Sequence, residues 1–196
     1  METYTKEHKE NLVKEMIRAI GEDPEREGLK GTPERVVRMW EEIFRGNRNN
    51  KPKVTVFPNG QDGITYDQMV IDEGNYHSQC EHHMVPFFGK YWFAYIPNKA
   101  GKILGISKVA RIVDYYAAKL QVQERLVQNI VDDLWLSLSE NCPEPIGMAL
   151  VMKGKHLCES MRGVKKEGNM TTIEVRGAFR DSPEVRAEFL KFVNGE

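Results

Sequence analysis

Cys80-Glu81-His82-His83 is the stretch that most constrains the fold, because it must meet a second stretch, His156-Leu157-Cys158, far along the chain. The chain has only three cysteines and five histidines, and these two stretches contain two of the cysteines and three of the histidines. Thiolate and imidazole are ligands that zinc prefers, and zinc sites commonly recruit ligands from two separate segments. The two stretches therefore predict a zinc site and a fold that brings them together.

Local geometry narrows the choice of ligands. If residues 80–83 form a helical turn, Cys80 and His83 lie on one face of the turn and His82 points elsewhere. If residues 156–158 are extended, His156 and Cys158 point to the same side of a strand. Cys80, His83 and Cys158 would then leave the fourth coordination position open, which is typical of a catalytic zinc.

Two other interpretations stay open on spacing alone. His156 could be the fourth ligand of a closed structural site, because ligands at i and i+2 of one strand are possible. The cysteines could also be inert core residues, as buried cysteines often are. If the site is open, Glu81, His82 and His156 are left near the metal as candidates for proton transfer.

Composition and charge agree with a globular enzyme. Of the 196 residues, 40% are hydrophobic and 29% are charged, and these are ordinary values. The net charge of −1 gives no general attraction to nucleic acid. No stretch approaches a membrane span, and the N-terminus has no apolar signal segment. The few cysteines leave no disulfide framework, so we expect a cytoplasmic protein with neither a nucleic-acid nor a membrane partner.

The apolar pattern changes along the chain. Helical spacing predicts one helix over residues 5–20 and a second that starts with Thr32 as its N-cap and ends before Gly46. Residues 45–52, rich in Asn and Gly, read as a linker.

The remainder mixes strand and helix patterns. It predicts strands over residues 54–57, 66–71, 91–96, 147–153 and 171–179, helices over residues 108–120 and 122–138, and a short final helix capped by Ser182. The sequence therefore predicts an α+β protein with an N-terminal helical hairpin, residues 1–50, and a domain of order ββ–αα–ββ, residues 51–196.

Basic residues near predicted turns suggest an anion site. Ser107 is a plausible N-cap, and Lys108 and Arg111 lie three residues apart on one face of the helix that follows. A helix N-terminus with two cations suggests phosphate, although a solvated basic face is the alternative. Arg162, four residues after Cys158, can reach whatever the metal acts on, and its guanidinium suits anion recognition.

Gln123 and Glu124 open a predicted helix. Glu124 could simply compensate the helix dipole. A carboxylate can also accept two hydrogen bonds from the edge of guanine while a neighbouring amide reads the carbonyl group.

Taken together, these motifs resemble the GTP cyclohydrolase I family. The resemblance runs through nearly the whole chain, in the order of residues 21–29, 32–36, 80–87, 104–112, 121–126, 156–158 and 161–164. A nucleobase deaminase would need a Pro-Cys-x-x-Cys run, which is absent around Cys158. A non-catalytic relative with a structural zinc would have little use for the remaining polar motif residues.

The resemblance implies the tunnelling fold, in which antiparallel sheets with two helices on one face join between subunits into a barrel. It implies a homodecamer of two pentamers, with active sites between subunits, and it favours the open zinc site. The implied reaction converts GTP to 7,8-dihydroneopterin triphosphate with release of formate, in pterin and folate biosynthesis.

The resemblance also implies roles for individual residues. They are zinc binding by Cys80, His83 and Cys158, guanine recognition by Gln123 and Glu124, triphosphate binding by Lys108, Arg111 and Arg162, a contact near the ribose by Ser107, and acid–base catalysis by His82 and His156. Glu81 is expected to contact the substrate.

Overall fold

A five-stranded sheet forms the centre of the protein, whose computed structural model describes residues 4–48 and 50–195. Its strand order is β5-β2-β3-β6-β7, and all neighbours are antiparallel except β2 and β5. The strands are β2 (Val70–Cys80), β3 (Pro86–Ile96), β5 (Leu120–Gln121), β6 (Gly147–His156) and β7 (Met170–Gly177). Two further strands, β1 (Val56–Pro58) and β4 (Lys102–Leu104), pair separately.

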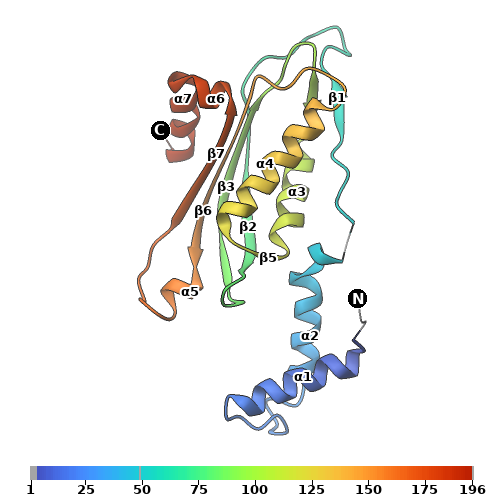
Figure 1. The fold of residues 1–196 in the computed structure, drawn as a ribbon, viewed down its shortest axis with the longest axis vertical. Helices are drawn as coiled ribbons and strands as arrows, with labels where there is room; N and C mark the ends of the chain where they lie inside the picture. Colours follow the sequence, from blue (N-terminus) through green and yellow to red (C-terminus); the bar gives the residue numbers. More distant parts are fainter. Residues whose placement is uncertain (1–3, 49, 196) are drawn as a thin grey trace.

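Helices cover both faces of this sheet (Figure 1). One face carries α3 (Ser107–Ala117) and α4 (Gln123–Ser139), and α4 buries Leu126, Ile130 and Leu134 at helical spacing. The other face carries α6 (Ala178–Asp181) and α7 (Pro183–Asn194) near one end of the sheet. Because β6 is covered on both sides, it is buried as a continuous run rather than in alternation.

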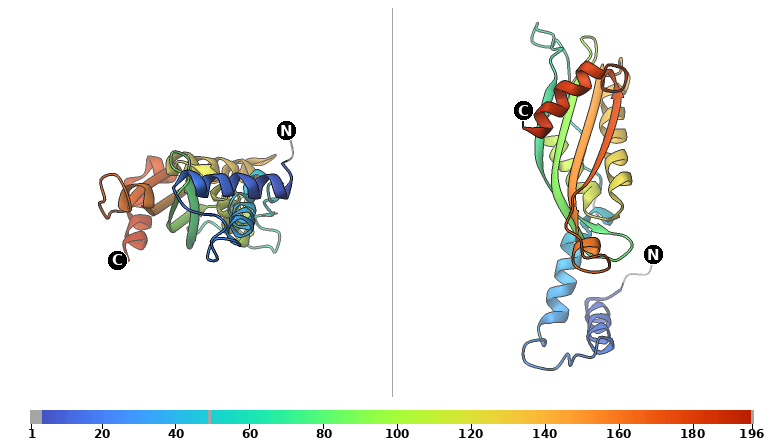
Figure 2. Two further views of the ribbon diagram at one scale, coloured as in Figure 1. Left: turned by 90° about the horizontal axis from the view of Figure 1, so that it is seen from below. Right: turned by 90° about the vertical axis from the view of Figure 1, so that its left-hand side faces the viewer.

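The N-terminal helices α1 (Lys6–Ala19) and α2 (Thr32–Ile43) have a small core of their own around Val13, Ile17 and Val37. They lie beyond one end of the sheet, as the right-hand view of Figure 2 shows. The short helix η1 (Arg45–Asn47) follows α2 and packs against the C-terminal end of α3. There the Gly46 N–H donates to the Ala118 carbonyl at 3.0 Å. A Cβ at Gly46 would lie 2.4 Å from the Tyr115 carbonyl oxygen, so this junction requires glycine.

The predicted α+β class and the ββ–αα–ββ order of the second part are confirmed. The strand predicted over residues 66–71 is misplaced, because β2 begins only at Val70 and runs to Cys80. The strand β3 begins five residues earlier than predicted, since it starts directly after the turn that carries Cys80 and His83. Five short elements were not predicted: η1, which lies in the predicted linker, β4, β5, α6 and a helical turn after β6, α5 (Leu157–Ser160). In addition, α6 and α7 cover the face of the sheet opposite the two predicted helices.

The predicted caps differ in outcome. The Ser182 side chain accepts a hydrogen bond from the Val185 N–H, as expected for the final helix. Thr32 is not an N-cap, because Gly31 holds that position and no side chain caps α2. Within the described residues, no helix combines the length and the apolar character that a membrane crossing requires.

Candidate metal centre and active site

The turn after β2 holds two of the predicted ligands. Cys80 is the last residue of β2, and the Met84 N–H donates to the Cys80 carbonyl at 2.8 Å, which closes a single helical turn. This turn places His83 Nδ1 3.9 Å from Cys80 Sγ. His82 Nδ1 also lies 4.0 Å from that sulfur, although the His82 side chain is exposed to solvent.

Cys158 reaches the same place from the end of β6. The predicted extended conformation of residues 156–158 is wrong: His156 ends β6 opposite Phe87, and Cys158 already lies in α5. The chain turns there because the pairing of β6 with β3 stops at His156, and the Met161 N–H donates to the Leu157 carbonyl at 3.0 Å. His156 and Cys158 therefore do not share a strand face.

Cys80, His83 and Cys158 form a group that could hold a metal ion. Among the described residues, one ligand atom from each lies within 4.8 Å of the others. The ligand atoms of a tetrahedral zinc, with bonds of about 2.0–2.3 Å, lie about 3.3–3.8 Å apart, so small side-chain shifts would complete such a site. Burial and the neighbouring Cys80 thiol raise the pKa of Cys158. A bound cation would offset this effect and favour the thiolates.

His156 stands beside the group but is not part of it. Its Nε2 lies 2.9 Å from Gln123 Oε1, and its ring stacks on Phe87 with centroids 4.5 Å apart and planes at 7°. Burial lowers the pKa of His156, while the charges of Glu159 and Glu124 partly oppose this shift. This geometry favours an open metal site over a closed one with His156 as fourth ligand.

The first turn of α4 carries the two residues expected to recognise guanine, and they differ in environment. Glu124 is exposed, and its charge acts on His156. Gln123 is 1% exposed, and its side-chain amide bonds to groups of this chain. A contact between the Gln123 side chain and a substrate would have to break one of these bonds.

Arg125 is a site residue for which the sequence predicted no role. Its guanidinium donates to the Glu81 carboxylate, to Gln121 Oε1 at 2.9 Å and to the Leu120 carbonyl at 3.1 Å. Glu81 Oε1 in turn lies 3.9 Å from His82 Nε2. Arg125 therefore ties the metal-bearing turn to α4. The sequence shows both charged residues, Glu81 and Arg125. It does not show that they pair, because their approach depends on strand β5, which was not predicted.

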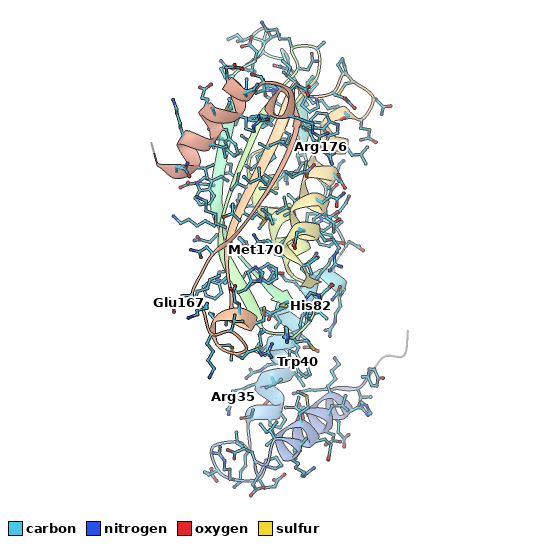
Figure 3. The ribbon with its side chains drawn as sticks, turned by 60° about the vertical axis from the view of Figure 1, so that its left-hand side comes forward. Arg35, Trp40, His82, Glu167, Met170 and Arg176 are labelled. Carbon is cyan, nitrogen blue, oxygen red and sulfur yellow. The ribbon has the colours of Figure 1, made fainter. Side chains whose placement is uncertain are left out.

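Arg162 lies against the metal group from the loop after α5. Its Nη1 donates to His83 Nε2 at 3.0 Å. Figure 3 shows His82 at this same end of the sheet, the end nearer to Trp40 of α2. The structure therefore gathers cationic, imidazole and thiol groups at one end of the molecule.

Ser107 and Lys108 begin α3, and Arg111 lies about one turn further along it. The C-terminal end of α3 leads into β5, which pairs with Gln79 and Cys80, whereas an 11-residue helix places its first residue about 15 Å away. Ser107 lines a cavity with residues 72–75 of β2, about 17–26 Å along the strand from Cys80.

Two details of this end differ from the sequence-based picture. Ser107 is not an N-cap, because Ile106 holds that position and no side chain caps α3. Arg111 lines a separate small cavity with Arg45 and Asp114. Within the described part of one chain, these three predicted residues are not brought to the metal group.

Comparison with known proteins identifies the family. The family model described as GTP cyclohydrolase I matches residues 9–194. The chain belongs to the GTP cyclohydrolase I family. It is 43% identical over 201 residues to GTP cyclohydrolase 1 of Bacillus pumilus, with complete coverage of both chains. It is 46% identical over 192 residues to GTP cyclohydrolase 1 of Aquifex aeolicus, with 97% of each chain covered.

A third relative, GTP cyclohydrolase 1 of Caldanaerobacter subterraneus subsp. tengcongensis, is 43% identical over 193 residues and covers 97% of this chain and 98% of its own length. As a member of the GTP cyclohydrolase I family the protein is an enzyme. The metal group formed by Cys80, His83 and Cys158 lies within the matched region and is consistent with the metal requirement of that family.

Proposed function

We propose that this enzyme uses zinc to hydrolyse and rearrange GTP to 7,8-dihydroneopterin triphosphate with release of formate, a reaction of pterin and folate biosynthesis. The observation that carries the proposal is the group of Cys80, His83 and Cys158, whose ligand atoms lie within 4.8 Å of one another, with His156 two residues before Cys158. The relatives named above support the choice of GTP as substrate.

Zinc is the metal that best suits these donors. Two sulfur atoms and one imidazole nitrogen form a soft set, and three protein ligands leave a position open for a water molecule or the substrate. A zinc ion in this site would supply Lewis acidity and activate water as a nucleophile near neutral pH.

His156 is proposed as the acid for the first hydrolysis. It would deliver a proton to N7 of guanine as C8 is hydrolysed and the imidazole ring opens. Because burial lowers the pKa of His156, its protonated form is a stronger acid than an exposed imidazolium. Phe87, stacked on the imidazole, shields one side of it from solvent.

His82 is proposed to serve the later steps at the ribose. Its side chain is exposed, and its Nε2 lies 3.9 Å from Glu81 Oε1. We propose that Glu81, held by Arg125, also contacts the substrate. The two histidines therefore occupy different environments, which suits two different proton transfers.

Guanine and triphosphate require further groups. Glu124, exposed at the start of α4, is proposed to accept hydrogen bonds from N1–H and the 2-amino group of guanine. Gln123 would contribute to guanine recognition only through its main chain, given its engaged side chain. Arg162, beside His83, would bind the phosphates.

The remaining residues are proposed to come from a neighbouring copy of the chain. Ser107 begins α3 and lines a cavity with residues 72–75 of β2, away from the end of the strand that carries Cys80. A homo-oligomer in which the start of α3 of one copy faces the metal group of another would complete the site. Family resemblance favours a decamer of two pentamers, built by residues 51–196, with residues 1–50 as a separate helical part.

A direct assay tests the proposal. The purified, zinc-loaded protein is incubated with GTP, and formate and the fluorescence of the oxidised pterin are followed together. The proposal predicts both products in equal amounts. Release of ammonia without formate would indicate a deaminase, and binding of GTP without any product would indicate a non-catalytic protein.

A further inference from the structure

The side-chain amide of Gln123 is unusually well satisfied for a residue expected to contact substrate. It has five partners within hydrogen-bond distance: the Met152 carbonyl, the Met170 carbonyl and Thr172 Oγ1 at Nε2, and Tyr76 and His156 at Oε1. A primary amide has two N–H groups and one oxygen with two lone pairs, so the three acceptors at Nε2 share two N–H groups and no capacity is left over.

The orientation of this amide is fixed by its surroundings. The carbonyl oxygens of Met152 and Met170, at 3.0 and 3.1 Å from Nε2, can only accept hydrogen bonds. A flipped amide would set its own oxygen against both of them, which is unfavourable. Gln123 Oε1 must therefore face the Tyr76 hydroxyl, at 3.0 Å, and His156 Nε2, at 2.9 Å.

This orientation determines the tautomer of His156. Because Gln123 Oε1 can only accept, the proton of neutral His156 lies on Nε2 and the lone pair lies on Nδ1. The stacking on Phe87, with planes at 7°, fixes the plane of the ring. Nδ1 is then the nitrogen that can exchange a proton with a substrate.

The chain is also shaped to admit this arrangement. A Cβ at Gly154 would lie 2.2 Å from the Tyr76 hydroxyl oxygen and 2.8 Å from Gln123 Oε1. Only glycine at this position leaves room for both groups beside β6. The Gln123 amide thus sits in a close-fitting pocket of main-chain and hydroxyl groups.

We propose that Gln123 is a positioning residue that fixes the ring orientation and the Nε2–H tautomer of His156, and that its side chain does not read guanine. The proposal rests on the proposed function for its kinetic consequences, since His156 acts there as the acid at N7. It places the proton donor of that step on Nδ1.

The first test replaces Gln123 by leucine in the full-length, zinc-loaded protein. We expect the single-turnover rate of formate release from bound GTP to fall about 100-fold, since an acid whose ring is no longer held in position loses most of its effect. The Kd for GTP and the preference for GTP over 2-aminopurine ribonucleoside triphosphate, which lacks the 6-oxo group, should stay within about threefold of the parent, because positioning acts on the chemical step. An unchanged rate with a loss of that preference would show that Gln123 reads guanine and would overturn the proposal.

Two further variants separate positioning from a general effect on folding. Gln123→Glu keeps an acceptor toward His156, so it should release formate faster than Gln123→Leu even if its melting temperature is lower. Thr172→Val removes one partner of the amide nitrogen but leaves Oε1 untouched, so formate release should stay within about threefold of the parent. A Thr172→Val variant as slow as Gln123→Leu, with Gln123→Glu no faster, would mean that the amide acts only through packing.

A spectroscopic readout does not depend on activity. In protein labelled with 15N-histidine, the His156 signals, assigned by their loss in His156→Asn, should report a proton on Nε2 in the neutral ring. A proton on Nδ1 would contradict the proposal even if the protein turns over GTP. Conversely, an Nε2–H signal in a parent protein that releases no formate would uphold the positioning and refute the proposed function.

Discussion

The regions around the two ends of α3 differ in how many of the proposed site residues contact one another within a single chain. At the C-terminal end, Cys80 meets His83, Arg162 meets His83, and Gln123 meets His156 within a single chain. At the N-terminal end, Ser107 lines a cavity with β2 residues that are remote from the metal group.

This difference has a physical origin. The metal end is built where β2, β3 and β6 stop pairing, so three strands deliver their terminal residues to one place. The start of α3 is fixed by packing of the helix along β2, which sets a separation of about 15 Å that no side chain spans. The comparison shows that one chain brings the three candidate metal ligands together, whereas under the proposed function the start of α3 serves the metal group of a neighbouring copy.

The largest expected effect on activity comes from removing one of the proposed metal ligands. Cys158→Ser should lose bound zinc and lower turnover by at least about 10³-fold, because a hydroxyl is a poor replacement for a thiolate ligand. Elemental analysis and the formate assay measure both quantities. The matched control is Cys142→Ser, which alters a half-buried thiol bonded to the Leu138 carbonyl. Full zinc occupancy in Cys158→Ser would remove Cys158 from the ligand set.

The next effect separates the two histidines at that end. His156→Asn should slow formate release by about 10²–10⁴-fold, as expected for loss of a general acid. His82→Asn should still release formate but accumulate a ring-opened intermediate before the pterin forms. Stopped-flow absorbance and formate detection follow the two stages.

The control for the two histidine variants is His77→Asn. It removes an exposed imidazole ring that stacks on Phe88. Both test variants should retain zinc. Loss of zinc from His156→Asn would instead indicate a closed site with four protein ligands, in which case the open-site chemistry proposed above would be wrong.

A smaller effect is expected for base recognition. Glu124→Gln should weaken GTP binding by about 1.5–3 kcal/mol, the usual range for a hydrogen bond to a charged group. The affinity would be measured by isothermal titration calorimetry with GTP. Both proteins would carry His156→Asn, so that GTP is consumed slowly during the titration. Glu140→Gln, at the opposite end of the same helix, is the control. An affinity within threefold of the parent would return Glu124 to the role of a surface charge at a helix terminus.

The smallest single effect is expected at the start of α3. Lys108→Ala should raise the KM for GTP by about tenfold and leave zinc content unchanged, since it removes one charge-assisted contact to phosphate. The difference from the parent should shrink in high salt and vanish for guanosine as a ligand. Lys99→Ala, an exposed lysine paired with Asp67, is the control. Equal weakening for guanosine and GTP would mean that Lys108 does not contact phosphate.

Much of the fold followed from the sequence because its signals are local. Apolar spacing located α4, whose buried stripe includes Leu126 and Leu134, and Ser182 marked the start of α7. The short strands β4 and β5 have no such periodicity, because two or three residues cannot show a pattern and their pairing partners are distant in sequence. Edge elements of this kind are decided by tertiary contacts.

The metal group was predictable because rare residue types cluster at ligand spacing. The local geometry around Cys158 was not, since the chain leaves β6 at His156 and turns into α5 within one residue. Likewise, Gln123 looks like any polar residue at a helix start until β6 and β7 supply the carbonyl groups that surround its amide. The partners of this amide come from the three strands β2, β6 and β7, so no window of sequence contains them.

The most direct test of the central claim combines two impaired variants and assays them at a GTP concentration far below the KM of the second, where each alone has little activity. One chain carries Cys158→Ser, and the other carries Lys108→Ala with Arg111→Ala. The two are co-expressed with different tags, and oligomers that contain both are purified. If each site takes its metal half from one copy and its anion half from another, random assembly restores roughly a quarter of the parental activity. Mixed oligomers no more active than either variant alone, alongside a fully active parent, would contradict the account and place the whole site within one chain.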